Sequence, residues 1–364
     1  MKEIKVSLNC RQNYSIIIGN NLLKNIPAYL NSLKLPREIF IVTNTLIKKK
    51  YGRELSSSLK KGGFSSRFYT VIDSEKAKSI SCAVRLVETL ADYARHKKIT
   101  VFAFGGGVVG DLASFIASIY KRGVPLVHIP TTLLAQIDSS IGGKTAIDLN
   151  IAKNLVGTFY QPRLVICDLR LLASLDKRQI RSGLAEAIKY AVIKDRRLFS
   201  FLEQRFHSIF SRDIPTLEHL VYECAGIKAK IVGLDEKEEK GIRTILNFGH
   251  TIGHAIESAG GYTKYSHGEA IALGMIAASR ISRSLGLLHP ETLQRVLNLI
   301  TNIGLPQEIS DIREKDVLRA YKLDKKFIGR TNRLVLIKDI GKTSVCQNIS
   351  EKAINNAIRE LFII

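Results

Sequence analysis

Residues 101–111 read VFAFGGGVVGD, a pattern that predicts a buried strand, a glycine-rich turn and the first turn of a helix. Glycines allow a backbone to approach a pyrophosphate, and a helix N-terminus directs N–H groups and partial positive charge toward it. The glycine spacing differs from the usual GxGxxG. Two interpretations therefore remain from this turn alone: a dinucleotide site, or a tight strand-to-helix turn that needs glycine for steric reasons.

The segments around this turn indicate an α/β domain. Short apolar runs at 39–43, 100–104 and 124–129 predict buried strands, and residues 76–97 have the apolar period of a helix. Strands that alternate with helical segments are typical of a parallel sheet with helices on both faces.

The character of the sequence changes near Leu175. From Lys177 onward most segments have helical period, as in the apolar stripes within 180–192 and 270–281, and only 333–338 resembles a strand. We therefore expect two domains, an α/β domain at 1–175 and a mainly helical domain at 176–364.

Composition excludes several classes of protein. Hydrophobic residues make up 45% of the 364 residues, which is enough for a packed core and too much for a disordered chain. No apolar run approaches the length of a membrane helix, and the N-terminus lacks the apolar core of a signal peptide. The five cysteines are scattered without a CxxC motif, which favours a reducing, cytoplasmic setting.

The chain is strongly basic, with 55 Lys and Arg against 33 Asp and Glu and a net charge of +22. The basic residues are dispersed, and no nucleic-acid-binding motif is present. We expect neither nucleic acid nor membrane as a partner. A solvated lysine-rich surface explains the charge, and attraction of a small polyanionic substrate is the second interpretation.

A second small-residue loop lies between Asp138 and Lys144. Its end, Gly143-Lys144-Thr145, resembles a P-loop, but Asp138 occupies the position where a P-loop needs glycine. The loop can hold an anion beside the lysine, or it can be a turn with a solvated lysine.

A histidine cluster predicts a metal site. His250 and His254 lie four residues apart on one helical face with Glu257, and His267 follows. This spacing favours His250 and His254 as a ligand pair, although histidines that face a polar cleft without metal would give the same pattern. Glu186 and Lys189 lie on another helix in an apolar context, which favours a cleft over bulk water.

Together these segments make the chain resemble the 3-dehydroquinate synthase family. The matching blocks follow the family's order over most of the chain, from Ile39 to about Gly341. They are GGGVVGDLASFIAS (105–118), KRG (121–123), PTTLLAQIDSSIGGKTAID (130–148), KNLVGTFYQP (153–162), SGLAEAIKYAVI (182–193), LNFGHTIGHAIE (246–257) and HGEAIALGM (267–275).

The resemblance implies a Rossmann-like N-terminal domain that binds NAD, a helical C-terminal domain that carries Zn²⁺ or Co²⁺, an active site in the cleft between them, and a homodimer. The implied NAD contacts are Asp73, Glu75, Lys78, Gly107, Val108, Val109, Gly110, Asp111, Thr131, Thr132, Lys144, Lys153, Leu171, Leu172, Ala173 and Ser174.

The resemblance also revises the metal ligands. It implies Glu186, His250 and His267 as ligands, with His254 facing the substrate instead. The catalytic and substrate-binding set, which includes Asp138 from the second loop, is Asp138, Lys144, Asn154, Lys189, Lys228, Arg243, Asn247, His254, Lys326 and Arg122. Lys230 is the alternative to Lys228, because the segment 235–241 carries an extra residue, and Lys325 is the alternative to Lys326.

The implied substrate is 3-deoxy-D-arabino-heptulosonate 7-phosphate, whose carboxylate and phosphate suit a Lys and Arg cluster. In this family NAD oxidises a carbinol, phosphate leaves by β-elimination, the hydride returns, and an aldol closure gives 3-dehydroquinate. The alternatives are another NAD- and metal-dependent sugar-phosphate cyclase, or a metal-dependent polyol dehydrogenase.

Overall fold

The computed structural model describes residues 1–8, 13–149, 152–328 and 332–362. The chain forms two compact units. Unit 1 comprises Met1–Leu175 and Ile214–Lys237, and unit 2 comprises Asp176–Asp213 and Glu238–Ile364. The segment Ile214–Lys237, which the boundary near Leu175 would assign to the second domain, therefore belongs to the first unit.

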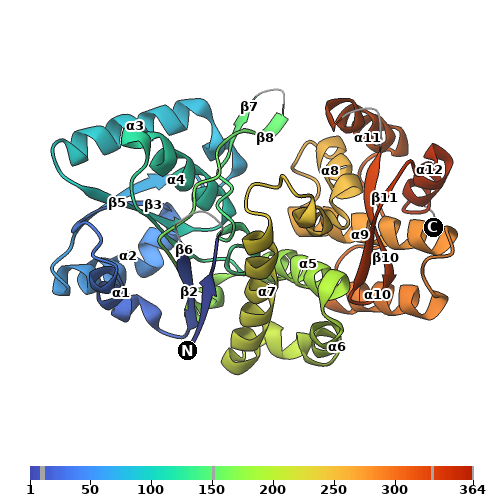
Figure 1. The fold of residues 1–364 in the computed structure, drawn as a ribbon, viewed down its shortest axis with the longest axis horizontal. Coiled ribbons are helices and arrows are strands. Elements are labelled where there is room, and N and C mark those ends of the chain that lie inside the picture. Colours follow the sequence, from blue (N-terminus) through green and yellow to red (C-terminus); the bar gives the residue numbers. More distant parts are fainter. Residues whose placement is uncertain (9–12, 150–151, 329–331, 363–364) are drawn as a thin grey trace. The chain divides into compact units, whose positions relative to one another are not determined.

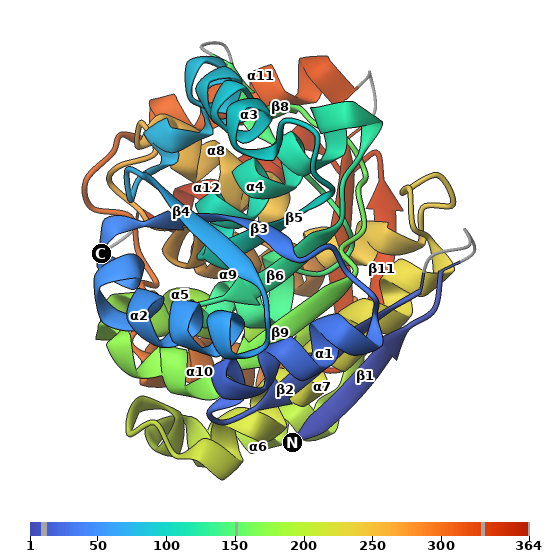
Figure 2. The same cartoon turned by 90° about the vertical axis from the view of Figure 1, so that its left-hand side faces the viewer.

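Unit 1 is built on a seven-stranded sheet with the order β1-β2-β9-β6-β5-β3-β4 (Figure 2). Strand β1 is antiparallel to β2, and every other neighbouring pair is parallel. In this order the strands span Lys2–Val6, Tyr14–Gly19, Leu164–Asp168, Leu126–Pro130, Ile99–Gly105, Glu38–Asn44 and Ser65–Val71. A separate hairpin pairs β7 (Ile147–Leu149) with β8 (Ala152–Val156).

Alternate residues of the central strands pack on opposite faces of this sheet. Phe40 and Val42 of β3 join a core with helices α3 and α4, whereas Ile39 and Ile41 join a core with α1 and α2. Strands buried on both faces explain the continuous apolar runs in the sequence.

The helices of unit 1 are α1 (Ile26–Ser32), α2 (Thr45–Lys61), α3 (Ile80–Ala94), α4 (Gly107–Ile119) and α7 (Ile214–Leu234), with short turns η1 (Leu22–Asn25), η2 (Glu75–Lys78), η3 (Tyr120–Arg122), η4 (Ala135–Ser139) and η5 (Leu169–Ser174).

The loops of interest follow the carboxyl ends of neighbouring strands. Helix α4 begins two residues after β5, the π-helical turn η4 follows β6, and η5 follows β9 directly. Gln136 of η4 ties two of these strands together, because its amide donates to the carbonyls of Pro130 and Asp168. This edge is where ligands bind in open α/β sheets.

Unit 2 is mainly helical, with helices joined to one antiparallel hairpin (Figure 1). Asn332 closes the open end of this hairpin. Its buried side-chain amide donates to the carbonyl oxygen of Ile349 and accepts from the backbone N–H of the same residue. Its elements are α5 (Lys177–Lys194), α6 (Arg196–Phe210), η6 (Ile242–Asn247), α8 (His250–Ala259), α9 (His267–Ser284), α10 (Pro290–Ile303), α11 (Glu314–Ile328), β10 (Arg333–Asp339), β11 (Lys342–Gln347) and α12 (Glu351–Arg359).

The predicted fold class, an α/β domain followed by a mainly helical part, is confirmed. The strands predicted at 39–43, 100–104, 124–129 and 333–338 correspond to β3, β5, β6 and β10. Strands β1, β2, β4, β9 and β11 and the hairpin β7–β8 were not predicted, so 333–338 is not the only strand after Leu175. Among the described residues, no helix is long and apolar enough to cross a membrane.

His128 on β6 makes unit 1 sensitive to acid. The ring is buried and lies 3.0 Å from the Ser114 hydroxyl, and burial lowers its pKa from 6.5 to about 4. The unfolded chain therefore binds this proton at higher pH than the folded one, so stability falls as pH drops from 6.5 toward 4. We expect this residue alone to reduce the free energy of unfolding by about 2 kcal/mol between pH 7 and pH 5.

Urea unfolding of the wild type and of His128→Gln at both pH values measures this effect. The neutral amide can still form a hydrogen bond with Ser114 and cannot be protonated. The free energy of unfolding of the variant should therefore fall by about 2 kcal/mol less than that of the wild type between pH 7 and pH 5. An equal loss in both proteins would contradict the assignment.

Candidate active site

Three helices of unit 2 converge because glycines let their backbones touch. A Cβ on Gly274 of α9 would lie 2.0 Å from the carbonyl oxygen of Gly249, the residue before α8. A Cβ on Gly268 would lie 2.3 Å from Cα of Ser182 on α5. These approaches exclude any larger residue, and they bring the first residues of α8 and α9, His250 and His267, toward α5.

The helix α5 contributes a buried carboxylate to this meeting point. Glu186 is fully buried, and its Oε1 lies 3.5 Å from Nε2 of His250 and 3.4 Å from Nε2 of His267. One ligand atom from each of these three residues lies within 4.8 Å of the others. Two imidazoles and one carboxylate are a donor set that suits Zn²⁺ or Co²⁺, so the group fits a divalent metal.

The protonation states within this group differ. Burial lowers the pKa of His250 well below its usual value, and the nearby Lys189 ammonium lowers it further, so this imidazole is neutral. Burial also disfavours the charged form of His267, but Glu186 and Glu257 outweigh it and raise the pKa to about 10. A metal that binds here therefore displaces a proton from His267.

Two other predicted residues of unit 2, Lys189 and His254, lie beside this group. Lys189 is buried one helical turn after Glu186 and forms an ion pair with it. The ring centroids of His254 and His250 lie 5.3 Å apart. His254 is exposed and is not part of the three-residue group. Arg243 is 2% exposed with its Nε 3.3 Å from Glu238.

Asn247, also predicted, is exposed at the end of η6. The Lys325 and Lys326 side chains lie outside the described residues, so the structure does not choose between them.

In unit 1 a buried lysine connects the glycine turn to the predicted NAD contacts at 73–78. Lys78 is 3% exposed, with Nζ 2.9 Å from Asp111 and 3.3 Å from Glu75. It also contacts the side-chain oxygen of Asn154. Although burial lowers the pKa of Lys78, the surrounding carboxylates outweigh it and raise the pKa. Lys78 is therefore a fixed cation that holds η2, α4 and β8 together.

Asp148, which the sequence did not single out, also belongs to this cluster. Its Oδ1 lies 3.9 Å from Nζ of Lys78 and accepts from the backbone N–H of Asn154. Its place at the end of the block KTAID (144–148) was the available signal. Lys153 lies 3.7 Å from Glu75.

The glycine turn is crowded by two of the other predicted segments. A Cβ on Gly106 would lie 3.0 Å from Thr132, and one on Gly107 would lie 3.3 Å from the Ser139 hydroxyl. The turn therefore has a steric reason for glycine, and α4 begins at Gly107 with its N–H groups at the sheet edge. Both interpretations left open by the sequence are compatible with this arrangement. Among the remaining predicted contacts, Val109, Thr131, Leu171 and Leu172 are buried, Val108, Gly110, Thr132 and Ser174 are half-buried, and Asp73 and Ala173 are exposed.

Asp138 of the second loop, which is half-buried, forms an ion pair with a buried lysine of α7. Nζ of Lys228 on α7 lies 2.8 Å from both a carboxylate oxygen and the carbonyl oxygen of Asp138. Lys230 is exposed, so Lys228 is the lysine of α7 that meets the loop. Lys144 and Arg122 are exposed.

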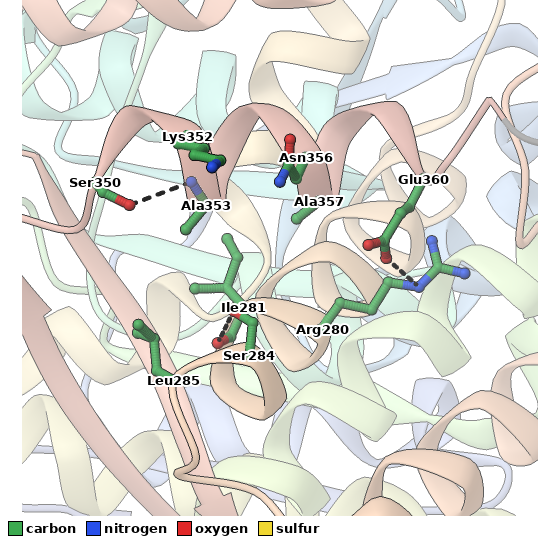
Figure 3. Close-up of a pocket in the computed structure, with 10 residues that line it drawn as sticks. All are labelled: Arg280, Ile281, Ser284, Leu285, Ser350, Lys352, Ala353, Asn356, Ala357 and Glu360. Atoms are coloured by element: carbon green, nitrogen blue, oxygen red, sulfur yellow. Dashed lines mark hydrogen bonds and ion pairs between the residues drawn. The ribbon is translucent and has the colours of Figure 1, made fainter.

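A cavity elsewhere in unit 2 does not include any predicted site residue. It has a volume of about 330 Å³ and lies between α9 and α12 (Figure 3). Arg280 and Glu360 form an ion pair at one side of it, while Ile281 and Ala357 contribute apolar surface. The candidate site therefore rests on the residue groups above and not on this cavity.

The folds of the two units and the imidazole–carboxylate group define a class of enzymes that contain NAD and a divalent metal. A 2-epi-5-epi-valiolone synthase from Streptomyces hygroscopicus, solved with NAD⁺ and Zn²⁺, is 27% identical, with a TM-score of 0.88 over 98% of this chain and 99% of that one. A 2-deoxy-scyllo-inosose synthase, complexed with carbaglucose-6-phosphate, NAD⁺ and Co²⁺, is 25% identical, with a TM-score of 0.88 over 99% and 100%.

Sequence comparison narrows this class to one family. The profile of the 3-dehydroquinate synthase N-terminal region matches residues 68–182, and that of the C-terminal region matches residues 183–327. A 3-dehydroquinate synthase from Desulforamulus reducens is 40% identical over 352 residues, which cover 96% of this chain and 98% of that one. The chain belongs to the 3-dehydroquinate synthase family.

Metal analysis separates the two possible histidine pairs. His250→Ala and His267→Ala should each lose Zn²⁺, because each removes one of the three converging donors. His254→Ala serves as the matched control and should keep the wild-type zinc content. Elemental analysis after dialysis measures this, and full zinc in His250→Ala would contradict the group.

Proposed function

We propose that this chain catalyses conversion of 3-deoxy-D-arabino-heptulosonate 7-phosphate to 3-dehydroquinate and phosphate, a carbon–oxygen lyase reaction of the shikimate pathway that leads to aromatic amino acids. The observation that carries the proposal is the convergence of Glu186, His250 and His267 in a chain of this family. The 40% identity to a synthase over nearly the whole of both chains supports the choice of reaction.

Unit 1 would bind NAD at the carboxyl edge of its sheet. The N-terminus of α4 offers N–H groups for the pyrophosphate at Gly107 to Asp111. Glu75 and Lys78 would contact the adenosine end together with Asp73, and the remaining predicted contacts line the neighbouring turns. Bound NAD⁺ in the valiolone synthase structure supports this role for the fold.

Unit 2 would hold the metal through Glu186, His250 and His267. Zn²⁺ is the proposed ion, with Co²⁺ as a substitute, in line with the ions of the two similar structures. When bound, NAD would supply transient oxidation and the metal would supply a Lewis acid for the substrate oxygen.

The chain's own residues would bind and orient the substrate anions. Lys189 is buried at the carboxylate end of the metal group, where its ammonium can donate a hydrogen bond or a proton to a substrate oxygen. Lys228 is held in one position by Asp138, so it can present N–H donors without further ordering. The other proposed substrate contacts are Lys144, Asn154, Arg243, Asn247, His254, Lys326 and Arg122.

We also propose that the protein works as a homodimer in the cytoplasm. Arg122 is exposed after α4, in a left-handed backbone conformation with φ of +64°, where it could reach a substrate phosphate bound to a second copy. The four described cysteines are free, which suits a reducing compartment.

A sister cyclase that acts on another sugar phosphate is the second candidate. The valiolone and inosose synthases have the same fold at 27% and 25% identity, so the scaffold alone does not select the substrate. The higher identity to the dehydroquinate synthase favours the first candidate.

A turnover assay with the heptulosonate phosphate tests the proposed reaction. Phosphate and 3-dehydroquinate should form in equal amounts without accumulation of NADH, and a chelator should abolish both. Lys189→Ala should keep its zinc and lose at least 100-fold in kcat, the order of a lost proton-transfer group. A metal-loaded wild type that is silent with this substrate but turns over another sugar phosphate would support the sister cyclase.

Replacement of Lys78 tests the proposed NAD site separately. Lys78→Met removes the buried cation that Glu75, Asp111 and Asp148 share and leaves Lys153 beside Glu75 only, so we expect NAD to bind at least tenfold more weakly. The zinc content should not change, because Lys78 lies in unit 1. Lys97→Met, which breaks only an exposed pair with Glu38, is the control. Calorimetric titration with NAD⁺ measures both, and an unchanged affinity in Lys78→Met would exclude it from the NAD site.

A further inference from the structure

Glu257 on α8 lies beside the metal group without belonging to the three converging donors. Its side chain is 12% exposed, and its Oε1 lies 3.5 Å from Nδ1 of His267. A carboxylate at this depth needs a partner that offsets its loss of hydration. The imidazole of His267 is such a partner. His267 is the first residue of the next helix, α9.

Both imidazoles of the group are oriented in the same way. Each directs Nε2 toward Oε1 of Glu186, at 3.5 Å for His250 and 3.4 Å for His267. On the opposite side of each ring, Nδ1 faces an acceptor. For His250 the acceptor is the carbonyl oxygen of Phe248 at 3.2 Å, and for His267 it is Glu257.

This pairing determines which nitrogen is available to a metal. A neutral imidazole carries one proton, and the nitrogen with that proton donates while the other keeps its lone pair. Once a metal has displaced the second proton of His267, an acceptor at Nδ1 would hold the remaining proton there and leave the Nε2 lone pair available to the metal on the side of Glu186. Acceptors of this kind fix the tautomer and ring orientation of metal-binding histidines and raise their basicity.

The two acceptors differ in charge. The Phe248 carbonyl is neutral, whereas Glu257 adds a second carboxylate beside Glu186 to a region that also contains the Lys189 ammonium. With the two carboxylates, a divalent cation is balanced in charge, and the Lys189 ammonium is then the excess positive group that can meet an anionic substrate.

We propose that Glu257 is a positioning residue of the metal centre, which fixes the tautomer and orientation of His267 and supplies the second negative charge. This inference rests on the proposed metal site. Glu257 acts through His267, since it faces the ring nitrogen opposite to the one that faces Glu186.

The test is the Zn²⁺ affinity of the metal-free protein, measured by competition with a chromophoric chelator at one pH. Glu257→Ala should bind Zn²⁺ about 10- to 100-fold more weakly than the wild type. Glu257→Gln keeps an acceptor oxygen and loses the charge, so its affinity should fall between the two. Glu203→Gln is the matched control, because Glu203 pairs with Arg295 in the same unit and should leave the affinity unchanged.

The outcomes separate this inference from the proposed function. If Glu257 had a merely structural role, metal-free Glu257→Gln would have a lower melting temperature than the wild type but the wild-type affinity for Zn²⁺. That result would overturn the inference alone. A wild type that binds no Zn²⁺ would overturn the metal centre and this inference with it. Weaker binding in the Glu257 variants with an unaffected control supports it.

Discussion

A fully buried carboxylate, Glu186, sets the constraint on which unit 2 depends. An ionised carboxylate without water is costly unless cations or hydrogen-bond donors surround it. Here Lys189 lies one turn along the same helix, and His250 and His267 approach from the first residues of two other helices. The close approaches at Gly268 and Gly274 allow those helices to come near enough. The packing of α5, α8 and α9 therefore also determines which charged and polar groups surround Glu186.

Unit 1 also contains a buried charge, but here the charge is positive. Lys78 is a buried cation surrounded by carboxylates from η2, α4 and β7. Because its neighbours outweigh the effect of burial, the ammonium remains charged and links these elements. Both units therefore organise ligand-binding edges around a buried charge.

Much of this was predictable from sequence. The parallel strands β3, β5 and β6 are buried on both faces. Their sequences are therefore continuous apolar runs, which are readily recognised as strands. Strands β1 and β4 alternate buried and exposed residues or contain polar ones, and their assignment depends on pairing with distant partners that periodicity does not reveal. Helix α7 has ordinary helical period, so its place in unit 1 follows only from contacts such as that between Gly233 and Ser7.

The site shows the same division. Spacing along one helix favoured His250 with His254, because residues four apart share a face. It could not find Glu186, which lies over sixty residues away and meets His250 only through helix packing. The family resemblance supplied that residue, and the structure brings the three donors together. Asp148 and the role of Glu257 were missed because each depends on the orientation of a side chain from another segment.

The central claim is that one carboxylate and two imidazoles hold a divalent metal. X-ray absorption at the zinc edge of the zinc-loaded, substrate-free protein tests it most directly. We expect nitrogen and oxygen neighbours only, with scattering from two imidazoles in both the wild type and His254→Ala, whereas His267→Ala should retain no zinc. Sulfur ligands, or the loss of an imidazole in His254→Ala, would contradict it.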